Sequence, residues 1–198
     1  IAGMLGVDAG ASVKHVARLH CAGGEAQAYR LAAYDGLETC GTAAVVSGGG
    51  KACSWGCLGL ADCEVACDFD AIIMDGNGLP VVDPDKCTAC GDCVVACPRN
   101  LFDIQRLDAD VLVQCSAPLA GDDAMAVCAV ACDACGRCAQ DAPEGLIRMV
   151  NNLPVVDMEA GPMGPRATER CPTGAITWLK DGRQEPSSTG PVLRRSHV

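Results

Sequence analysis

The spacing of the cysteines constrains this chain more than any other feature. Sixteen of its 198 residues are cysteine, and the run from Cys87 to Pro98 reads C-x2-C-x2-C-x3-C-P. A cysteine content this high indicates either a disulfide scaffold or a protein built around metal. Disulfide scaffolds are typically short secreted domains, and the chain carries no recognisable secretion signal. We therefore expect the thiols to bind metal.

The type of metal follows from the spacing within that run. Three thiolates separated by two residues can wrap one face of an iron-sulfur cubane, and the fourth, a helical turn later, points at a neighbouring cluster. A zinc ribbon would instead present cysteine pairs separated by about 15 residues. The spacing therefore predicts [4Fe-4S] clusters, as in bacterial ferredoxins, and a zinc-bound structural module is a remote alternative.

Because the fourth cysteine of this run would bind a neighbouring cluster, a second cysteine motif is required. Such a motif is present upstream. Its four cysteines have the spacing C-x3-C-x5-C-x3-C, with Leu60 where a regular motif has its second cysteine. We expect Cys53 to replace that missing thiolate. Crossed ligation then predicts one cluster on Cys53, Cys57, Cys63 and Cys97 and a second on Cys67, Cys87, Cys90 and Cys93.

An internal duplication divides the chain. The segment Leu79 to Asp83 recurs as Leu153 to Asp157, 74 residues later. At an offset of 75, four cysteines at 40, 53, 57 and 63 fall on cysteines at 115, 128, 132 and 138. We therefore expect a two-cluster unit over 40–110 and a second unit over 111–181. Residues 1–39 would form an N-terminal segment and 182–198 a disordered tail.

The second unit has lost part of its cysteines. Ala142, Gly161, Gly164 and Ala167 stand at ligand positions of a regular motif. All four belong to one cluster under crossed ligation, and the other set, Cys132, Cys135, Cys138 and Cys171, is complete. The pattern predicts three [4Fe-4S] clusters in the chain, with Cys128 as a possible extra ligand that could replace Cys135.

Four cysteines remain without an assigned cluster: Cys21, Cys40, Cys115 and Cys128. Free cysteine is among the residues most often buried, which favours small apolar packing for these four. Because Cys40 and Cys53 recur as Cys115 and Cys128, thiol hydrogen bonding beside a cluster and alternative ligation stay open.

The expected fold is α+β and loop-rich, with tandem ferredoxin-like units of short strands and short helices. Strands are predicted at 79–82 and 110–113, single-turn helices at 61–66 and 92–96, and a further helix at 25–34. Aromatic residues are only 3% of the chain, too few for a large side-chain core. Cluster binding should therefore supply much of the folding free energy. Five apolar residues are expected to keep water from the clusters: Val65, Ile72, Val82, Val94 and Val95.

The remaining signals exclude several functions. A net charge of -10 argues against nucleic acid and favours a basic protein surface as partner. No apolar run approaches the ~18 residues of a membrane span. The glycine-rich stretch before Lys51 lacks the flanking residues of a phosphate loop, and no dinucleotide-binding glycine motif is found. No arrangement of catalytic side chains is recognised, so we expect an electron carrier without substrate-bond chemistry.

Beyond the cysteine runs, the chain resembles a known family. The resemblance lies in the runs VARLHCAGG at 16–24, GGKACSWGCLG at 49–59, GLPVVD at 78–83 and PRN at 98–100. These runs are similar to the B subunit of the Rnf complex, an ion-translocating electron-transport assembly of bacterial and some archaeal membranes. Asp68, in place of the proline that usually follows a fourth cysteine, departs from the ferredoxin pattern.

This resemblance implies a function and a location. The B subunit would be a polyferredoxin on the cytoplasmic face of the membrane, peripheral in this fragment. A membrane helix and a further cluster-binding segment would precede Ile1. It would take electrons from soluble ferredoxin and relay them through other membrane subunits toward NAD, with coupled sodium or proton transport. The alternative is an electron-wiring subunit of another redox enzyme, such as a hydrogenase or a molybdenum oxidoreductase.

Overall fold

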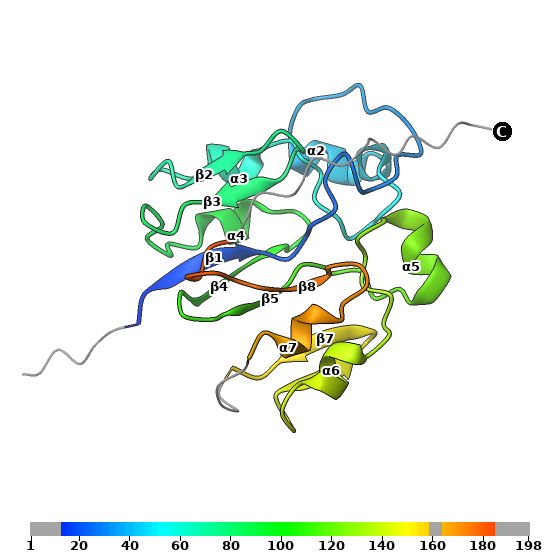
Figure 1. Ribbon diagram of the computed structural model, residues 1–198. Helices are drawn as coiled ribbons and strands as arrows, with labels where there is room; N and C mark the ends of the chain where they lie inside the picture. Colours follow the sequence, from blue (N-terminus) through cyan, green and yellow to red (C-terminus); the bar gives the residue numbers. More distant parts are fainter. Residues whose placement is uncertain (1–12, 159–163, 185–198) are drawn as a thin grey trace, which may run out of the picture.

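A computed structural model describes residues 13–158 and 164–184. Two units of similar build follow one another along the chain (Figure 1). The first contains β1 (His15–Leu19), α2 (Cys40–Val45), the 3-10 helix η1 (Ser47–Gly50), α3 (Asp62–Val65), β2 (Ile72–Met74), β3 (Pro80–Val82), α4 (Asp92–Ala96) and β4 (Phe102–Arg106). The second contains β5 (Val111–Val113), α5 (Gly121–Val127), α6 (Arg137–Asp141), β6 (Ile147–Val150), β7 (Leu153–Val156), α7 (Arg166–Glu169) and β8 (Ile176–Trp178).

Each unit holds one antiparallel hairpin. In the first, β2 pairs with β3, and in the second β6 pairs with β7. The β6–β7 turn consists of Asn151 and Asn152, both with positive φ (49° and 66°). A two-residue hairpin turn with positive φ at both positions matches the twist of the strands, and asparagine tolerates that conformation better than most residues.

A second strand pair closes each unit. β1 pairs with β4 and β5 with β8, both antiparallel. Figure 1 shows these four strands between the α3–α4 end of the molecule and the α6–α7 end. β1 lies in the segment 1–39, which we expected to precede the first unit. Its pairing with β4 joins that segment to the unit and gives no boundary at residue 40.

Most of the predicted elements form, with one exception. β3, β5, α3 and α4 confirm the expected short strands and helices. The helix predicted at 25–34 is wrong. There, the Tyr29 N–H donates to the Val127 carbonyl (3.1 Å) and the Tyr29 carbonyl accepts from Ala52 (2.9 Å). Because these backbone groups bond to distant segments, they are not available to an intrahelical ladder.

Small apolar cores lie around the cysteines of each unit. In the first, Leu19, Ile72 and Phe102 pack with Cys57, Cys63 and Cys93. In the second, Val111, Ile147 and Ile176 pack with Cys138. Of the residues expected to exclude water, Ile72 and Val82 are buried and Val94 packs against the first core.

Val65 and Val95 are not among the buried residues that exclude water. Their side chains are 84% and 88% exposed. Each lies on a single-turn helix, one face of which carries the buried cysteine, Cys63 or Cys93. The expectation for Val65 and Val95 was wrong, because so short a helix can bury only one face.

No helix in residues 13–158 and 164–184 is long and apolar enough to cross a membrane. The expected disordered tail falls almost wholly on residues 185–198, and Gly161 also lies outside the described residues.

One buried amide ties the loop after β1 to the β2–β3 turn. Asn77 is 2% exposed. Its Oδ1 accepts a hydrogen bond from the Ala26 N–H (2.8 Å), and its Nδ2 donates to Gln27 Oε1 (2.7 Å). The side chain thus satisfies a buried backbone donor that no water can reach without loosening the loop.

Asn77→Ala should therefore lower the free energy of unfolding by about 1–3 kcal/mol, because the Ala26 N–H loses its acceptor. The measurement is chemical unfolding of the anaerobic, metal-loaded chain. Glu38→Ala, at an exposed position, is the control and should change stability by less than about 0.5 kcal/mol. Equal stability of the two variants would contradict this role for Asn77.

Candidate iron-sulfur sites

The first cysteine set surrounds a pocket in the first unit. Cys57, Cys63 and Cys97 line it together with Cys40. Cys53, the fourth ligand expected from the sequence, lines a different pocket. We therefore propose Cys40, in place of Cys53, as the fourth ligand of this set.

Asp62 holds Cys40 in this position. Its two carboxylate oxygens accept hydrogen bonds from the Cys40 and Gly41 N–H groups, both at 2.9 Å, at the start of α2. Asp62 is also the first residue of α3 and precedes Cys63. The carboxylate thus brings two distant segments together. Sequence spacing could not reveal this, because Cys40 lies outside the motif and is brought in by a side-chain contact.

The four cysteines of the second predicted set lie together. Cys67, Cys87, Cys90 and Cys93 all line one pocket. Cys67 follows α3, whereas the other three precede or lie within α4. Gly91 has a φ of 92°, which lets the chain turn sharply between Cys90 and Cys93. The Ala17 N–H in β1 faces the Cys87 sulfur at 3.5 Å.

The third set gathers in the second unit. Burial raises the pKa of Cys132 and Cys138, and neighbouring thiols add to the effect, those of Cys115, Cys138 and Cys171 for Cys132 and those of Cys171 and Cys135 for Cys138. Cys138 is buried in α6, and Cys171 follows α7 and packs on the same core. Ala142 and Ala167, at positions where a cluster ligand is missing, also pack on this core. Apolar contact has thus taken the place of ligation there.

The buried thiols are poor acids without metal. Burial raises the pKa of Cys57 to about 12 and those of Cys93 and Cys132 to about 11. A bound metal supplies the positive charge that replaces the proton. Backbone amides oppose the effect of burial, from Gly59 for Cys57 and from Ala134 for Cys132. Four thiolates with amide donors are the donor set of an iron-sulfur cluster.

The cysteine sulfurs of the first two sets surround pockets and do not converge on the position of a single metal ion. In the part of the chain that the structure describes, no three His, Cys, Asp or Glu side chains converge closely enough to hold a single metal ion. A tetrahedral zinc site would need sulfurs about 2.3 Å from one ion. Sets of four sulfurs around one pocket instead fit a cluster, which each sulfur binds through a different iron atom.

His20 lies between two polar partners at the junction of the two units. Its Nε2 pairs with Asp103 (2.9 Å) and its Nδ1 lies 2.7 Å from the Val113 carbonyl. Burial lowers the pKa of His20, but the Asp103 carboxylate and the Val113 carbonyl outweigh it, so that the pKa is raised. Both ring nitrogens are thus engaged by the protein.

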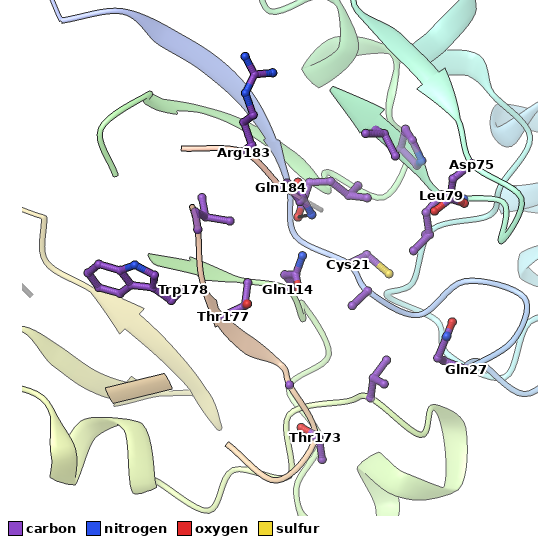
Figure 2. A pocket seen from close by; sticks show the side chains of 17 residues that line it. Cys21, Gln27, Asp75, Leu79, Gln114, Thr173, Thr177, Trp178, Arg183 and Gln184 are labelled. Atoms are coloured by element: carbon purple, nitrogen blue, oxygen red, sulfur yellow. Dashed lines mark hydrogen bonds between the residues drawn. The ribbon is translucent and has the colours of Figure 1, made fainter. Parts of the chain in front are cut away.

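An open groove runs between the two units beside these sites. Figure 2 shows Cys21 and Gln114 near its centre, with Trp178 on the side of the second unit and Asp75 and Leu79 on the side of the first. The Ala22 N–H bonds to the Gln114 carbonyl (3.1 Å), which joins the units at this point.

Comparison with known proteins agrees with these sites. A 4Fe-4S binding domain family matches residues 79–102. The B subunit of the Na⁺-translocating ferredoxin:NAD⁺ oxidoreductase complex of Acetobacterium woodii is 37% identical over 177 residues, 89% of this chain and 53% of the relative. The B subunit of the proton-translocating ferredoxin:NAD⁺ oxidoreductase complex of Clostridium ljungdahlii is 38% identical over 84% of this chain and 60% of the relative. The B subunit of the ion-translocating oxidoreductase complex of Methanosarcina acetivorans is 36% identical over 89% of this chain and 67% of the relative.

This chain belongs to the Rnf B-subunit family. It spans about half the length of the Acetobacterium relative (53%). The resemblance to the Rnf B subunit is therefore confirmed over most of this chain, and the match at 79–102 covers the run that begins at Cys87.

In this Rnf B-subunit chain, Cys40→Ser and Cys63→Ser should disturb the same cluster. Each should lower the iron content by about four atoms per chain, and the double variant should lose no more than Cys63→Ser alone. Iron and sulfide analysis with EPR of the reduced protein checks this. If instead Cys53→Ser abolishes the signal that Cys63→Ser abolishes, and Cys40→Ser leaves it, Cys53 is the ligand.

Removal of the clusters should unfold most of the Rnf B-subunit chain. The cores are small and built partly of cysteine, so thiolate–metal bonds replace much of the usual apolar burial. Anaerobic chelation followed by circular dichroism and amide hydrogen exchange measures the effect. Native-like exchange protection in the iron-free chain would contradict the expectation.

Proposed function

We propose that this chain is the electron-relay part of the B subunit in an ion-translocating ferredoxin:NAD oxidoreductase complex. The observation that carries the proposal is that two sets of four cysteines each line a pocket of the first unit, while Cys138 and Cys171 pack on the core of the second unit, which backbone contacts join to the first. The relatives named above are subunits of such complexes. Coupled ion transport would take place in the assembled complex.

The chemistry is the movement of single electrons, which a bound [4Fe-4S] cluster accepts and donates without making or breaking substrate bonds. The cysteines of the chain would bind the clusters, and its apolar residues would exclude water from them. Leu19, Leu101 and Phe102 border the first pocket with side chains that are 4% exposed or less. The Leu101 N–H faces the Cys97 sulfur at 3.5 Å. Such amide contacts favour the more negative, reduced state.

Electrons would enter and leave at two exposed cysteines. Cys90 in the first unit and Cys135 in the second are exposed, whereas the cysteines at 57, 63, 93 and 138 are buried. A cluster held by an exposed cysteine lies near the surface, where a partner's redox centre can approach it. We therefore propose that soluble ferredoxin docks at one of these two ends and another member of the complex at the other.

The acidic surface bears on the partners. Asp92 and Asp133 lie near the two exposed cysteines, and the Asp133 carboxylate accepts from the Cys135 N–H (3.1 Å). With a net charge of -10, the chain would dock most readily on a basic surface. We place it on the cytoplasmic face of the membrane, held there by the other subunits.

A transfer experiment tests the function. A bacterial two-cluster ferredoxin, reduced with dithionite and freed of excess reductant, is mixed anaerobically with the cluster-loaded chain in a stopped-flow instrument. We expect ferredoxin to be reoxidised as the chain bleaches, and NADH alone to leave the chain oxidised. The iron-free chain is the control and should accept no electrons.

The competing assignment, a wiring subunit of a hydrogenase or molybdenum enzyme, is separated by reconstitution. A full-length B subunit that carries this segment should restore ferredoxin-dependent NAD reduction to an Rnf complex that lacks its own. Failure to accept electrons from ferredoxin, or stable association with a hydrogenase in place of the membrane complex, would overturn the proposed function.

A further inference from the structure

Four cysteines from four separate segments meet where the two units join. Cys21, Cys53, Cys115 and Cys128 all line one pocket. The two cysteine-lined pockets of the first unit are each lined by four cysteines. The pocket between the units thus offers the same number of sulfurs as each of those two.

Contacts within the pocket show that the sulfurs face a common space. A Cβ atom at Gly23 would lie 2.8 Å from the Cys128 sulfur and 3.9 Å from the Cys21 sulfur. A Cβ atom at Gly56 has the Cys53 sulfur 3.4 Å away. Charge on Cys21 acts on the other three cysteines of the pocket. Glycine is required at 23 because any side chain would meet the Cys128 sulfur.

The two units contribute equivalent pairs. Cys21 lies two residues after β1, and Cys115 lies two residues after β5. Cys53 precedes Cys57 by four residues, and Cys128 precedes Cys132 by four. The offset of 75 matched Cys115 with Cys40, but the strand order matches it with Cys21. With Cys40 assigned to the first set and Cys53 moved here, the remaining four cysteines form two equivalent pairs. Cys21 and Cys53 come from the first unit, and Cys115 and Cys128 come from the second.

The environment of these thiols is that of cluster ligands. The side chains of Cys21, Cys53 and Cys128 are 6–7% exposed. The Cys57 N–H donates to the Cys21 sulfur at 3.4 Å. Backbone amides also serve the other three sulfurs, from Trp55 for Cys53, from Val130 for Cys128, and from Cys132 and Ala117 for Cys115.

A half-buried positive charge lies at the same pocket. Lys51 lines it, and its ammonium group donates to the carbonyls of Gly23 (2.6 Å) and Cys57. Four thiolates on a cluster carry net negative charge, and a fixed ammonium group stabilises such charge in a site of low dielectric. Simple packing of neutral thiols gives no reason for a cation there.

We propose that Cys21, Cys53, Cys115 and Cys128 bind a fourth [4Fe-4S] cluster between the two units. Four cysteines line this one pocket, and within residues 13–158 and 164–184 no three side chains converge on a point as a single zinc ion would require. All sixteen cysteines then fall into four sets of four.

The position of this cluster makes the electron path continuous. On one side, the Cys57 N–H donates to the Cys21 sulfur, which joins the pocket to the first set. On the other side, the Cys132 amide bonds to the Cys115 sulfur, which joins it to the third set. The fourth cluster therefore lies between those two sets and replaces, as a relay, the cluster that the second unit has lost.

Metal analysis of the full chain tests the site. The anaerobically purified wild type should contain about sixteen iron and sixteen sulfide per chain, and Cys128→Ala and Cys21→Ala about twelve of each. The double variant should also retain about twelve. Gln114→Ala, on the wall of the same pocket, is the matched control and should keep the wild-type content. The signals altered by Cys63→Ser and Cys171→Ser should persist in Cys128→Ala, which shows that the variant folds.

The outcomes separate this site from the proposed function, which also requires clusters but only the other three sets. About twelve iron in the wild type, unchanged in both variants, overturns the fourth cluster and leaves the relay in place. Twelve iron with one zinc, the zinc lost in Cys128→Ala, also overturns it in favour of a structural ion. A wild type without iron overturns both proposals.

Discussion

Ligation of iron by cysteine sulfur is the interaction on which the rest of this structure depends. The described helices have at most seven residues and the strands at most five, and each sheet has only two strands. Such elements bury little apolar surface by themselves. The cysteines that hold the clusters are also members of the apolar cores. The fold is therefore specified mainly by the positions at which each set of four cysteine sulfurs must meet. The apolar side chains pack around these positions.

The two units would complete a four-cysteine cluster site in two different ways. The second unit keeps the regular motif, with Cys135 in the place that Leu60 takes in the first. The first unit brings in Cys40 from a helix held by Asp62. Since a cluster needs four sulfurs of suitable direction, and not a fixed spacing, a thiol from outside the motif can complete the site if another side chain anchors its segment.

Local patterns predicted the structure well, and contacts between distant segments did not follow from them. The strand expected at 79–82 and the single-turn helices at 61–66 and 92–96 are short-range features and form as β3, α3 and α4, whereas crossed ligation at Cys67 and Cys97 stays a prediction from spacing. The role of Cys40 depends on a carboxylate contact across 22 residues. The segment at 25–34 has a helical pattern, but its backbone bonds to residues of both units, such as Val127 and Gly50. No local propensity contains that information.

The bridges between Ala28 and Cys128 and between Arg30 and Lys51 carry a consequence for maturation. They place the segment after β1 between two halves that are translated far apart. The pocket between the units is lined by residues of both halves, of which Ala131 is the last in the sequence. It is therefore complete only after residue 131 has been synthesised and the second unit has docked. With the proposed fourth cluster in this pocket, the sites inside a single unit would be loaded independently and the shared site would be filled last.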